Sequence, residues 1–315
     1  MMINKNIDFI KLGRYIFPVS IVIMVISFSL IFLMKMNLGI DFTSGTRFDM
    51  AVSKLDNEII SIDEIKKIIE QTSLKDNYTI KELEGEQTKN IQIFSIISQD
   101  AFNESDIISK LDNGEYLYDV NQSSKTTISP KMGSELINSA ALSLGIAVML
   151  ILLYITIRFN SFFALGSILA LVHDISITFG IFILFNLEIS LPIIAAFLTI
   201  LGYSLNDTIV IFDRIRENLN LKKKDESIFS VTNKSINQTL TRTMLTSLTT
   251  LIVLTILYFV GSYLIKLFTF ALIIGVIIGT YSSIFIASFF FTILYNKYNH
   301  LLNKSESEES VNKNE

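Results

Sequence analysis

Cysteine and tryptophan are absent from the 315 residues, and only three prolines and two histidines occur. Without cysteine the chain forms no disulfide and offers no thiolate ligand to a metal. The two histidines do not form a ligand-like cluster, so we expect no metal site. An excess of basic residues is also lacking, because 26 Lys and Arg stand against 30 Asp and Glu. The charge balance therefore gives no basis for binding nucleic acid.

Long apolar runs are what the sequence has instead, and half of its residues are hydrophobic. A helix needs roughly 20 apolar residues to cross a bilayer core. Six runs come close to this length: 15–34, 137–157, 162–185, 189–212, 244–265 and 267–294. We therefore predict a multi-pass α-helical membrane protein with six transmembrane helices. The first run is longer than the core of a cleaved signal peptide, and we interpret it as an uncleaved signal anchor.

Residues 35–135 form the only long polar stretch between two runs, and we expect them to fold as a separate domain. Ser61 followed by Glu64 is typical of a helix start. The pattern predicts strand, helix, strand, strand, helix and strand at residues 46–52, 61–72, 78–83, 91–97, 104–111 and 116–127. This order is that of an α+β, ferredoxin-like domain.

Lys and Arg collect in alternate short loops, and such residues are retained on the cytoplasmic side of a membrane. They occur in residues 1–14, after the second run at Arg158, and in the predicted loop 213–243. We therefore expect both termini in the cytoplasm and residues 35–135 outside it. The polar residues 296–315 lack apolar periodicity and are predicted to be a disordered cytoplasmic tail.

Charged residues inside the apolar runs are costly and need a reason. Asp207 lies on the same helical face as Tyr203, Val210 and Arg214, at spacings of four, three and four residues. The next run is preceded and entered by a threonine series, Thr239, Thr243, Thr246 and Thr250, with Arg242 beside it. If the two faces meet, burial favours the protonated form of Asp207 and the guanidinium of Arg242 favours the ionised form. Such a balance suits a proton-coupled machine.

Other interpretations of these residues stay open. Asp207 and Arg242 also fit a static buried ion pair that orients helices. Asn206 fits a static structural role and a role in proton coupling equally well. His173 and Asp174 are adjacent, so we expect them to face different partners, in packing and hydrogen bonding or in proton movement. A small-residue stripe that includes Gly275 and Gly279 predicts close helix packing.

Five segments resemble the SecF family of membrane proteins, in the right order and at the right intervals. The most characteristic is GYSLNDTIVIFDRIREN at residues 202–218. The others are LGIDFTSGT at 38–46, ALVHDIS at 170–176, NQTLTRTMLTSLTT at 237–250 and GTYSSIFIA at 279–287. Two positions depart from the family, which usually has glycine where Ser44 and Ser129 stand.

The resemblance implies a subunit of the Sec protein-export machinery in the cytoplasmic (inner) membrane, within the resistance-nodulation-division superfamily. It implies pairing with SecD in a twelve-helix unit that uses the proton gradient to pull preproteins outward. The implied partners are SecD, the SecYEG channel, SecA, YajC and YidC, with unfolded preprotein as substrate and no cofactor besides the proton. Asp207 and Arg242 match the family's proton path, with His173, Asp174, Asn206 and Thr246 as supporting polar residues.

Two other functions remain: a proton-coupled exporter of small molecules or lipids from the same superfamily, and a non-transporting scaffold for SecD. The single outer domain of about 100 residues argues against the exporter, which would have larger outer domains. An ATP-driven enzyme is not expected, because the GxxxxGK[ST] phosphate loop is absent.

Overall fold

A computed structural model describes residues 7–298 apart from 57, 73, 75–77, 84–90, 101, 112–114, 160, 224 and 225. The chain divides into two compact units. One is a helical bundle, and the other comprises residues 38–142 together with residues 188–191. Of the predicted tail, residues 296–298 still belong to the last helix, and the remainder lies outside the described residues.

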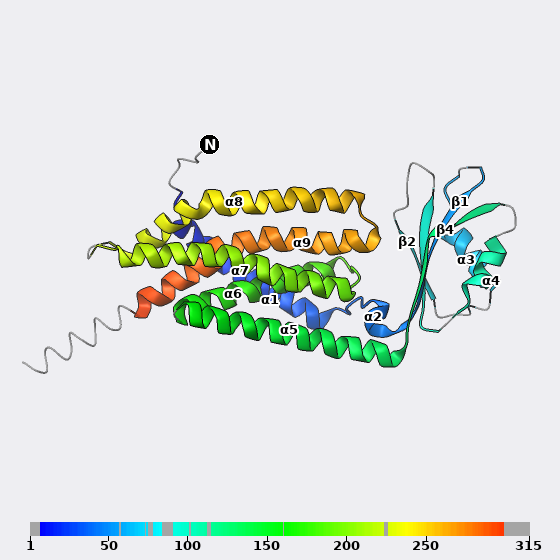
Figure 1. Cartoon of the computed structure of the whole chain (residues 1–315), viewed down its shortest axis with the longest axis horizontal. Helices are drawn as coiled ribbons and strands as arrows, with labels where there is room; N and C mark the ends of the chain where they lie inside the picture. The colour runs from blue at the N-terminus through cyan, green and yellow to red at the C-terminus, as the bar shows by residue number, and fades with distance from the viewer. Residues whose placement is uncertain are drawn as a thin grey trace, which may run out of the picture. The chain divides into compact units, whose positions relative to one another are not determined.

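The described residues contain six helices that are long and apolar enough to cross a membrane. They are α1 (Phe9–Leu33), α5 (Pro130–Arg158), α6 (Ser161–Leu184), α7 (Leu191–Asn220), α8 (Ile228–Val260) and α9 (Tyr263–Ser282). Helix α9 continues through the short π-helix η2 (Ser283–Ala287) to Tyr298. In Figure 1 these helices run alongside one another. The prediction of a six-helix membrane protein is confirmed.

The predicted loop 213–243 is mostly helical, and this part of the prediction is wrong. Helix α7 continues to Asn220, and α8 begins at Ile228 behind a Ser227 cap that accepts a hydrogen bond from the Ser230 backbone N–H. The error arises because hydropathy detects only the apolar part of a helix. A 33-residue helix spans about 50 Å, well beyond the roughly 30 Å of a bilayer core. Polar helical turns therefore extend past the membrane.

The fifth predicted run also extends too far, because α8 ends at Val260 and not at residue 265. Gly261 adopts an extended conformation there, and Ser262 begins the next helix. Both flanking sequences are strongly apolar, so a hydropathy pattern places the turn poorly.

The second unit contains a four-stranded antiparallel sheet with the order β2-β3-β1-β4. Its elements are α2 (Ile40–Thr43), β1 (Gly45–Lys54), α3 (Ile62–Glu70), β2 (Tyr78–Leu83), β3 (Gln92–Ser98), α4 (Glu104–Leu111) and β4 (Tyr116–Ile128). The order of elements and of strands agrees with the predicted ferredoxin-like fold. Buried side chains of the sheet and helices, among them Phe48, Phe94, Ile65 and Ile107, form its core.

Ser61 and Ser129 both begin helices. The Ser61 hydroxyl accepts a hydrogen bond from the Glu64 backbone N–H and donates one to the Glu64 carboxylate, so the predicted helix start at Ser61 is confirmed. The Ser129 hydroxyl accepts from the Met132 backbone N–H at 3.3 Å. Pro130 follows as the first residue of α5, where its missing N–H costs nothing. Serine at position 129 therefore caps α5, which a glycine does less well.

Candidate functional site

Asp207 lies on α7 inside the bundle, with 2% of the residue exposed. Its Oδ2 atom is 3.4 Å from the Ser247 hydroxyl of α8 and 3.5 Å from the Thr280 hydroxyl of α9. The two hydroxyls are 2.6 Å apart. Hydroxyl-to-oxygen hydrogen bonds usually measure about 2.7–2.8 Å, so the carboxyl group is held loosely. Asp207 therefore lies where three helices meet, contacted by hydroxyls that belong to two of them.

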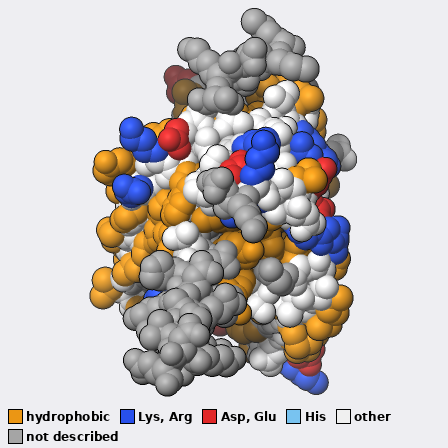
Figure 2. Space-filling model, turned by 90° about the vertical axis from the view of Figure 1, so that its left-hand side faces the viewer, with side chains coloured by type: hydrophobic (Ala, Val, Ile, Leu, Met, Phe, Trp, Pro, Cys, Tyr) orange, Lys and Arg blue, Asp and Glu red, His pale blue; other side chains and the backbone are white. Residues whose placement is uncertain are grey.

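A cavity of about 660 Å³ lies at the end of the bundle where α7 ends and α8 begins. Its lining is mostly charged or polar: Arg158, Val210, Asp213, Arg214, Arg216, Glu217, Asn220, Gln238, Thr239 and Arg242. Figure 2 looks onto this end, where several Lys and Arg side chains are exposed and hydrophobic side chains surround them. Val210 follows Asp207 by three residues, so the cavity reaches to about one helical turn from the carboxyl group.

Arg242 is exposed on the wall of this cavity. Among the described residues it forms no ion pair with Asp207. The static buried ion pair considered above is therefore not formed in this structure. Arg242 instead places a positive charge between the charged end of the bundle and the buried carboxyl group.

Helices α7 and α8 meet along the predicted faces. The Tyr203 hydroxyl donates to the Thr250 hydroxyl at 2.8 Å and lies 3.0 Å from the Thr246 carbonyl oxygen. The Thr246 hydroxyl bonds to carbonyls of its own helix and does not reach Asp207. The Thr243 hydroxyl is buried without a hydrogen-bond partner among the described residues. This unpaired hydroxyl lies one turn from Ser247 and one residue from Arg242.

A second polar centre forms around Asp174 of α6, which is fully buried. Its Oδ2 atom accepts hydrogen bonds from Ser204 of α7 at 2.5 Å and Ser282 of α9 at 2.8 Å. Its Oδ1 atom lies 2.9 Å from Nδ1 of His173. The two side chains thus contact each other, and their further partners differ as expected. The His173 ring stacks on Tyr281 of α9, whereas Asp174 bonds to the two serines. His173 is also buried, and its Nε2 atom has no partner in the described part of the chain.

The two centres belong to one polar seam between α7 and α9. Ser204 precedes Asp207 by three residues, and Ser282 follows Thr280 by two. Beside them, the hydroxyls of Thr208 and Ser283 lie 2.8 Å apart. The π-helix η2 begins at Ser283, next to this contact, and single π turns often mark functional sites in helices.

Gly275 and Gly279 bring α9 close to α7. A Cβ atom at Gly279 would lie 2.9 Å from Cβ of Ser204, and one at Gly275 would overlap the side chain of Ile200. The close approach is what lets Thr280 and Ser282 reach the buried carboxylates. Asn206, in contrast, is exposed on the outer face of α7 and does not join the seam.

The segment that joins α6 to α7 is bonded into the second unit. Glu188 is 3% exposed, and its carboxylate lies 3.2 Å from the Arg47 guanidinium of β1 and 3.5 Å from Nζ of Lys81 of β2. The Gly39 backbone N–H donates to the Ile189 carbonyl at 2.9 Å. We call residues 188–191 the clamp segment.

Sequence reasoning found both buried carboxylates but missed their hydroxyl partners Ser204, Ser247, Thr280 and Ser282. Serine and threonine are common in membrane helices, so their presence alone does not indicate a functional site. The signal that was available is their location in YSLND, TSLTT and GTYSS, three of the segments that carry the family resemblance. The described residues contain no cluster of three or more His, Asp or Glu suited to a metal ion.

Comparisons with known proteins agree with these features. The family "Protein export membrane protein SecD/SecF, C-terminal" matches residues 109–297, and the "SecD/SecF GG Motif" matches residues 29–54. The SecF subunit of Desulfurispirillum indicum is 38% identical over 312 residues, covering 97% of this chain and 98% of that protein. The SecF subunit of Rhodothermus marinus is 51% identical over 167 residues, covering 51% and 54%.

Solved structures show the same architecture. The crystal structure of SecDF, a translocon-associated membrane protein from Thermus, superposes with a TM-score of 0.81 at 32% identity over 94% of this chain. A super-membrane-facing form of SecDF gives a TM-score of 0.68 at 29% identity over 97%. This chain spans 40% and 41% of those two chains. The chain belongs to the SecD/SecF family of protein-export membrane proteins.

Proposed function

We propose that this chain is a SecF-type subunit of a protein-export machine, and that protonation of Asp207 couples the proton-motive force to movement of the outer unit. The observation that carries the proposal is a buried carboxyl group one helical turn from a charged cavity. An ionised carboxylate is costly in such a place unless donors compensate it. The Ser247 and Thr280 hydroxyls supply little of that compensation, because each lies 3.4–3.5 Å from the carboxylate and only 2.8–2.9 Å from a carbonyl oxygen of its own helix.

The proton route ends in the cavity beside Arg242, because the proton-motive force drives protons inward and we place this end of the bundle in the cytoplasm. The unpaired Thr243 hydroxyl and the Ser247 hydroxyl lie on successive turns of α8 between this cavity and Asp207. A buried polar group without a protein partner is a place where water binds. We therefore assign Thr243 and Ser247 to the path, with Arg242 stabilising the ionised form of Asp207. A proton that crosses the membrane supplies about 2.3 kcal/mol per 100 mV.

Movement of α6 and α7 reaches the outer unit through the clamp segment. This segment connects the helix that carries Asp174 directly to the helix that carries Asp207. Its Glu188 is bonded to β1 and β2 of the ferredoxin-like domain. A change in the helices' positions therefore acts on the sheet through the ionic contacts of the buried Glu188 carboxylate.

SecD is the partner that the family membership favours, since this chain spans 40% of a SecDF chain. One face of α7 supports the pairing: exposed small or polar residues recur at spacings of four, three and four at Ala195, Thr199, Gly202 and Asn206. Such stripes allow a second membrane helix to approach closely. We propose that SecD binds there. SecYEG, SecA, YajC and YidC remain partners proposed from the family resemblance, as is preprotein.

The distribution of Lys and Arg supports the orientation proposed for the chain. These side chains gather at the end where α5 and α7 end and α8 begins (Figure 2), and cytoplasmic loops retain such residues. We place this end and both termini in the cytoplasm, in the inner membrane, with the ferredoxin-like domain outside.

The test is export by the SecD-paired chain in proteoliposomes, with and without a proton gradient. We expect Asp207→Asn to abolish the gradient-dependent part of export while insertion and SecD binding persist. Asp63→Asn, an equal change at an exposed carboxylate of α3, serves as the control and should export normally. Full gradient-dependent export by Asp207→Asn would leave only a scaffold role for this chain.

A further inference from the structure

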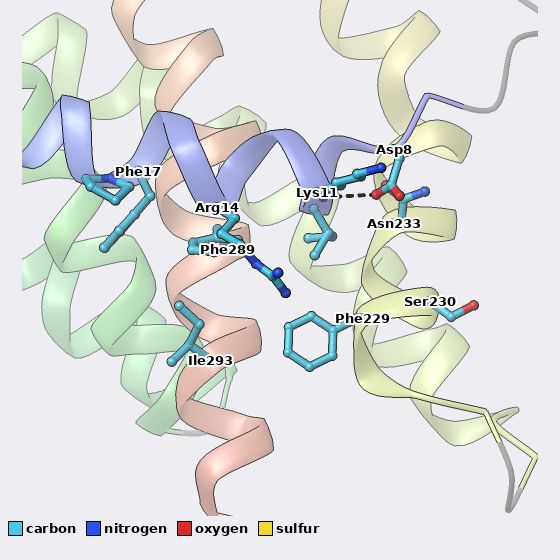
Figure 3. Close-up of a pocket in the computed structure, with 11 residues that line it drawn as sticks. Asp8, Lys11, Arg14, Phe17, Phe229, Ser230, Asn233, Phe289 and Ile293 are labelled. Carbon is cyan, nitrogen blue, oxygen red and sulfur yellow. Dashed lines mark hydrogen bonds between the residues drawn. The ribbon is translucent and has the colours of Figure 1, made fainter.

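A second cavity, of about 870 Å³, lies between the beginning of α1, the beginning of α8 and the residues that follow η2. Its lining combines charged and apolar side chains: Asp8, Ile10, Lys11, Arg14, Phe17, Pro18, Phe229, Ser230, Asn233, Phe289 and Ile293. Figure 3 shows three elements facing this space from three sides. None of the residues assigned to the proton path lines it.

Lys11 and Arg14 give this cavity a positive charge. Both are exposed, and neither forms an ion pair with any described residue. In Figure 3 the Arg14 guanidinium extends into the cavity, toward the ring of Phe229. Asp8 is the only acidic residue of the lining. Its carboxylate caps α1 by accepting a hydrogen bond from the Lys11 backbone N–H at 2.9 Å, and among the described residues it forms no ion pair with Lys11 or Arg14.

Apart from its three charged residues and Ser230 and Asn233, the described lining of the cavity is apolar. Phe17, Phe229, Phe289 and Ile293 line it. On α1 next to the cavity, Leu12 is 46% exposed and Tyr15 is 71% exposed. Because α1 is long and apolar enough to cross a membrane, we place these side chains where the acyl region of a bilayer begins. The cavity thus brings two cations together with aromatic rings.

We propose that this cavity binds an anionic phospholipid, with its phosphate at Lys11 and Arg14 and the beginning of its acyl chains against Phe17 and Phe289. Basic pockets between membrane helices on the cytoplasmic side suit such headgroups. A free phosphate would use the same cations but would leave the aromatic lining without a partner. A soluble acidic peptide would not reach the acyl level of the bilayer.

The lipid would join two elements that the protein already links. The Phe9 backbone N–H donates to the Asn233 side chain at 2.8 Å, and the Ile7 backbone N–H donates to Asn237 at 3.1 Å. These bonds hold the beginning of α1 against α8, the helix that carries Arg242 and Ser247. A phosphate bound between Arg14 and the beginning of α8 would strengthen this contact between α1 and α8.

The test uses the full chain purified with SecD from nanodiscs that contain equal amounts of phosphatidylglycerol and phosphatidylcholine. Lipid that remains bound after detergent exchange is measured by native mass spectrometry. We expect selective retention of phosphatidylglycerol and a loss of about thirtyfold in the Lys11→Gln, Arg14→Gln double variant, since each cation near the membrane contributes about fivefold. The Lys11→Arg, Arg14→Lys variant keeps both charges and should retain the lipid.

The matched control is Lys222→Gln, Lys223→Gln, which removes two exposed cations from the connection between α7 and α8. It should retain phosphatidylglycerol like the unchanged chain. Equal retention by the Lys11 and Arg14 double variant, or equal retention of phosphatidylcholine, would overturn the proposal. Displacement of the lipid by inorganic phosphate would also overturn it, because this would indicate a site for a free anion. Absence of lipid when SecD is bound would overturn it as well, because this would indicate that SecD fills the cavity.

Discussion

Ser44 adopts a backbone conformation, φ 63° and ψ 171°, that residues other than glycine rarely occupy. Its neighbour Gly45 has φ +123°, and a Cβ atom there would overlap the Ser98 carbonyl oxygen. The family usually has two glycines at these positions. This chain therefore holds a strained serine where β1 begins, and the strain explains why glycine suits that place.

Replacing the strained serine should stabilise the protein. We expect Ser44→Gly to raise the free energy of unfolding by about 1 kcal/mol, because relief of backbone strain exceeds the entropy that an added glycine costs. Thermal unfolding of the full chain in detergent measures the change. Gly45→Ala is the opposing control and should lower the unfolding temperature. An unchanged or lower unfolding temperature for Ser44→Gly would show that the serine conformation is not strained.

The two buried carboxylates differ in how firmly they are held. Asp174 accepts two short hydroxyl hydrogen bonds and contacts His173. Asp207 has only two long contacts. A carboxylate with short hydrogen bonds fits a structural role, because its donors fix its position. A carboxylate with only long contacts can gain or lose a proton without breaking such bonds. We therefore assign the transfer role to Asp207 and a positioning role to Asp174.

Asp174→Ala should destabilise the bundle more than Asp207→Ala. The change leaves Ser204, Ser282 and His173 buried without their partner, at a cost of about 3–5 kcal/mol. Unfolding temperatures of the two variants, measured in the same detergent, provide the comparison. Equal destabilisation would mean that both carboxylates are equally integrated in the bundle.

The charged residues of the candidate site could be predicted from the sequence, but the hydroxyl residues that contact them could not. Asp207 and His173 with Asp174 stand out because charge within an apolar run is costly. The position of Arg242 was identified, but its exposure was not, because that depends on how α8 packs. Thr246 was named and Ser247 was not, because Thr246 belongs to the threonine series of this helix. Which turn of a helix faces a neighbour is decided by tertiary packing.

At the scale of elements, the packing of α9 on α7 depends on Gly275. We expect Gly275→Ala to lower the free energy of unfolding by about 1–3 kcal/mol, because the added methyl group overlaps Ile200. Gly145→Ala is the matched control, since no atom lies within 4 Å of its added Cβ. It should be neutral or slightly stabilising, as alanine favours helix. Equal effects at both glycines would contradict close packing at Gly275.

The clamp segment gives a prediction about coupling. Glu188→Gln keeps the shape of the side chain but removes the charge that pairs with Arg47 and Lys81. We expect gradient-dependent export to fall several-fold while SecD pairing is retained, because the outer unit then follows α6 and α7 less closely. Lys54→Gln alters another ionic cluster of the same unit and should export normally. Equal export by Glu188→Gln and the unchanged chain would exclude the clamp as a coupling element.

The order of the elements followed from the sequence, and their ends often did not. The outer domain was predictable because strands and short amphipathic helices alternate between polar turns, as at Ser61. Helices α7 and α8 exceeded their predicted lengths because polar residues such as Arg214 and Lys234 continue a helix without an apolar signal. The turn at Gly261 was predicted several residues too late, because apolar residues flank it on both sides.

At the scale of the whole molecule, α7 presents an exposed stripe that fits another membrane helix. We expect Gly202→Leu to reduce copurification of SecD at least several-fold, because the side chain blocks close approach. Gly145→Leu is matched to it, since both glycines have open space at the added Cβ, and should leave copurification unchanged. Loss of SecD in both variants, or in neither, would place the SecD contact elsewhere.

The most direct test of the account is infrared spectroscopy of the SecD-paired chain in membranes, with the Asp207→Asn variant subtracted to isolate the Asp207 carboxyl band. We expect a protonated carboxyl band that disappears and returns as pH and the proton gradient change. A band that stays the same at every pH and gradient, whether protonated or ionised, would contradict proton transfer at Asp207.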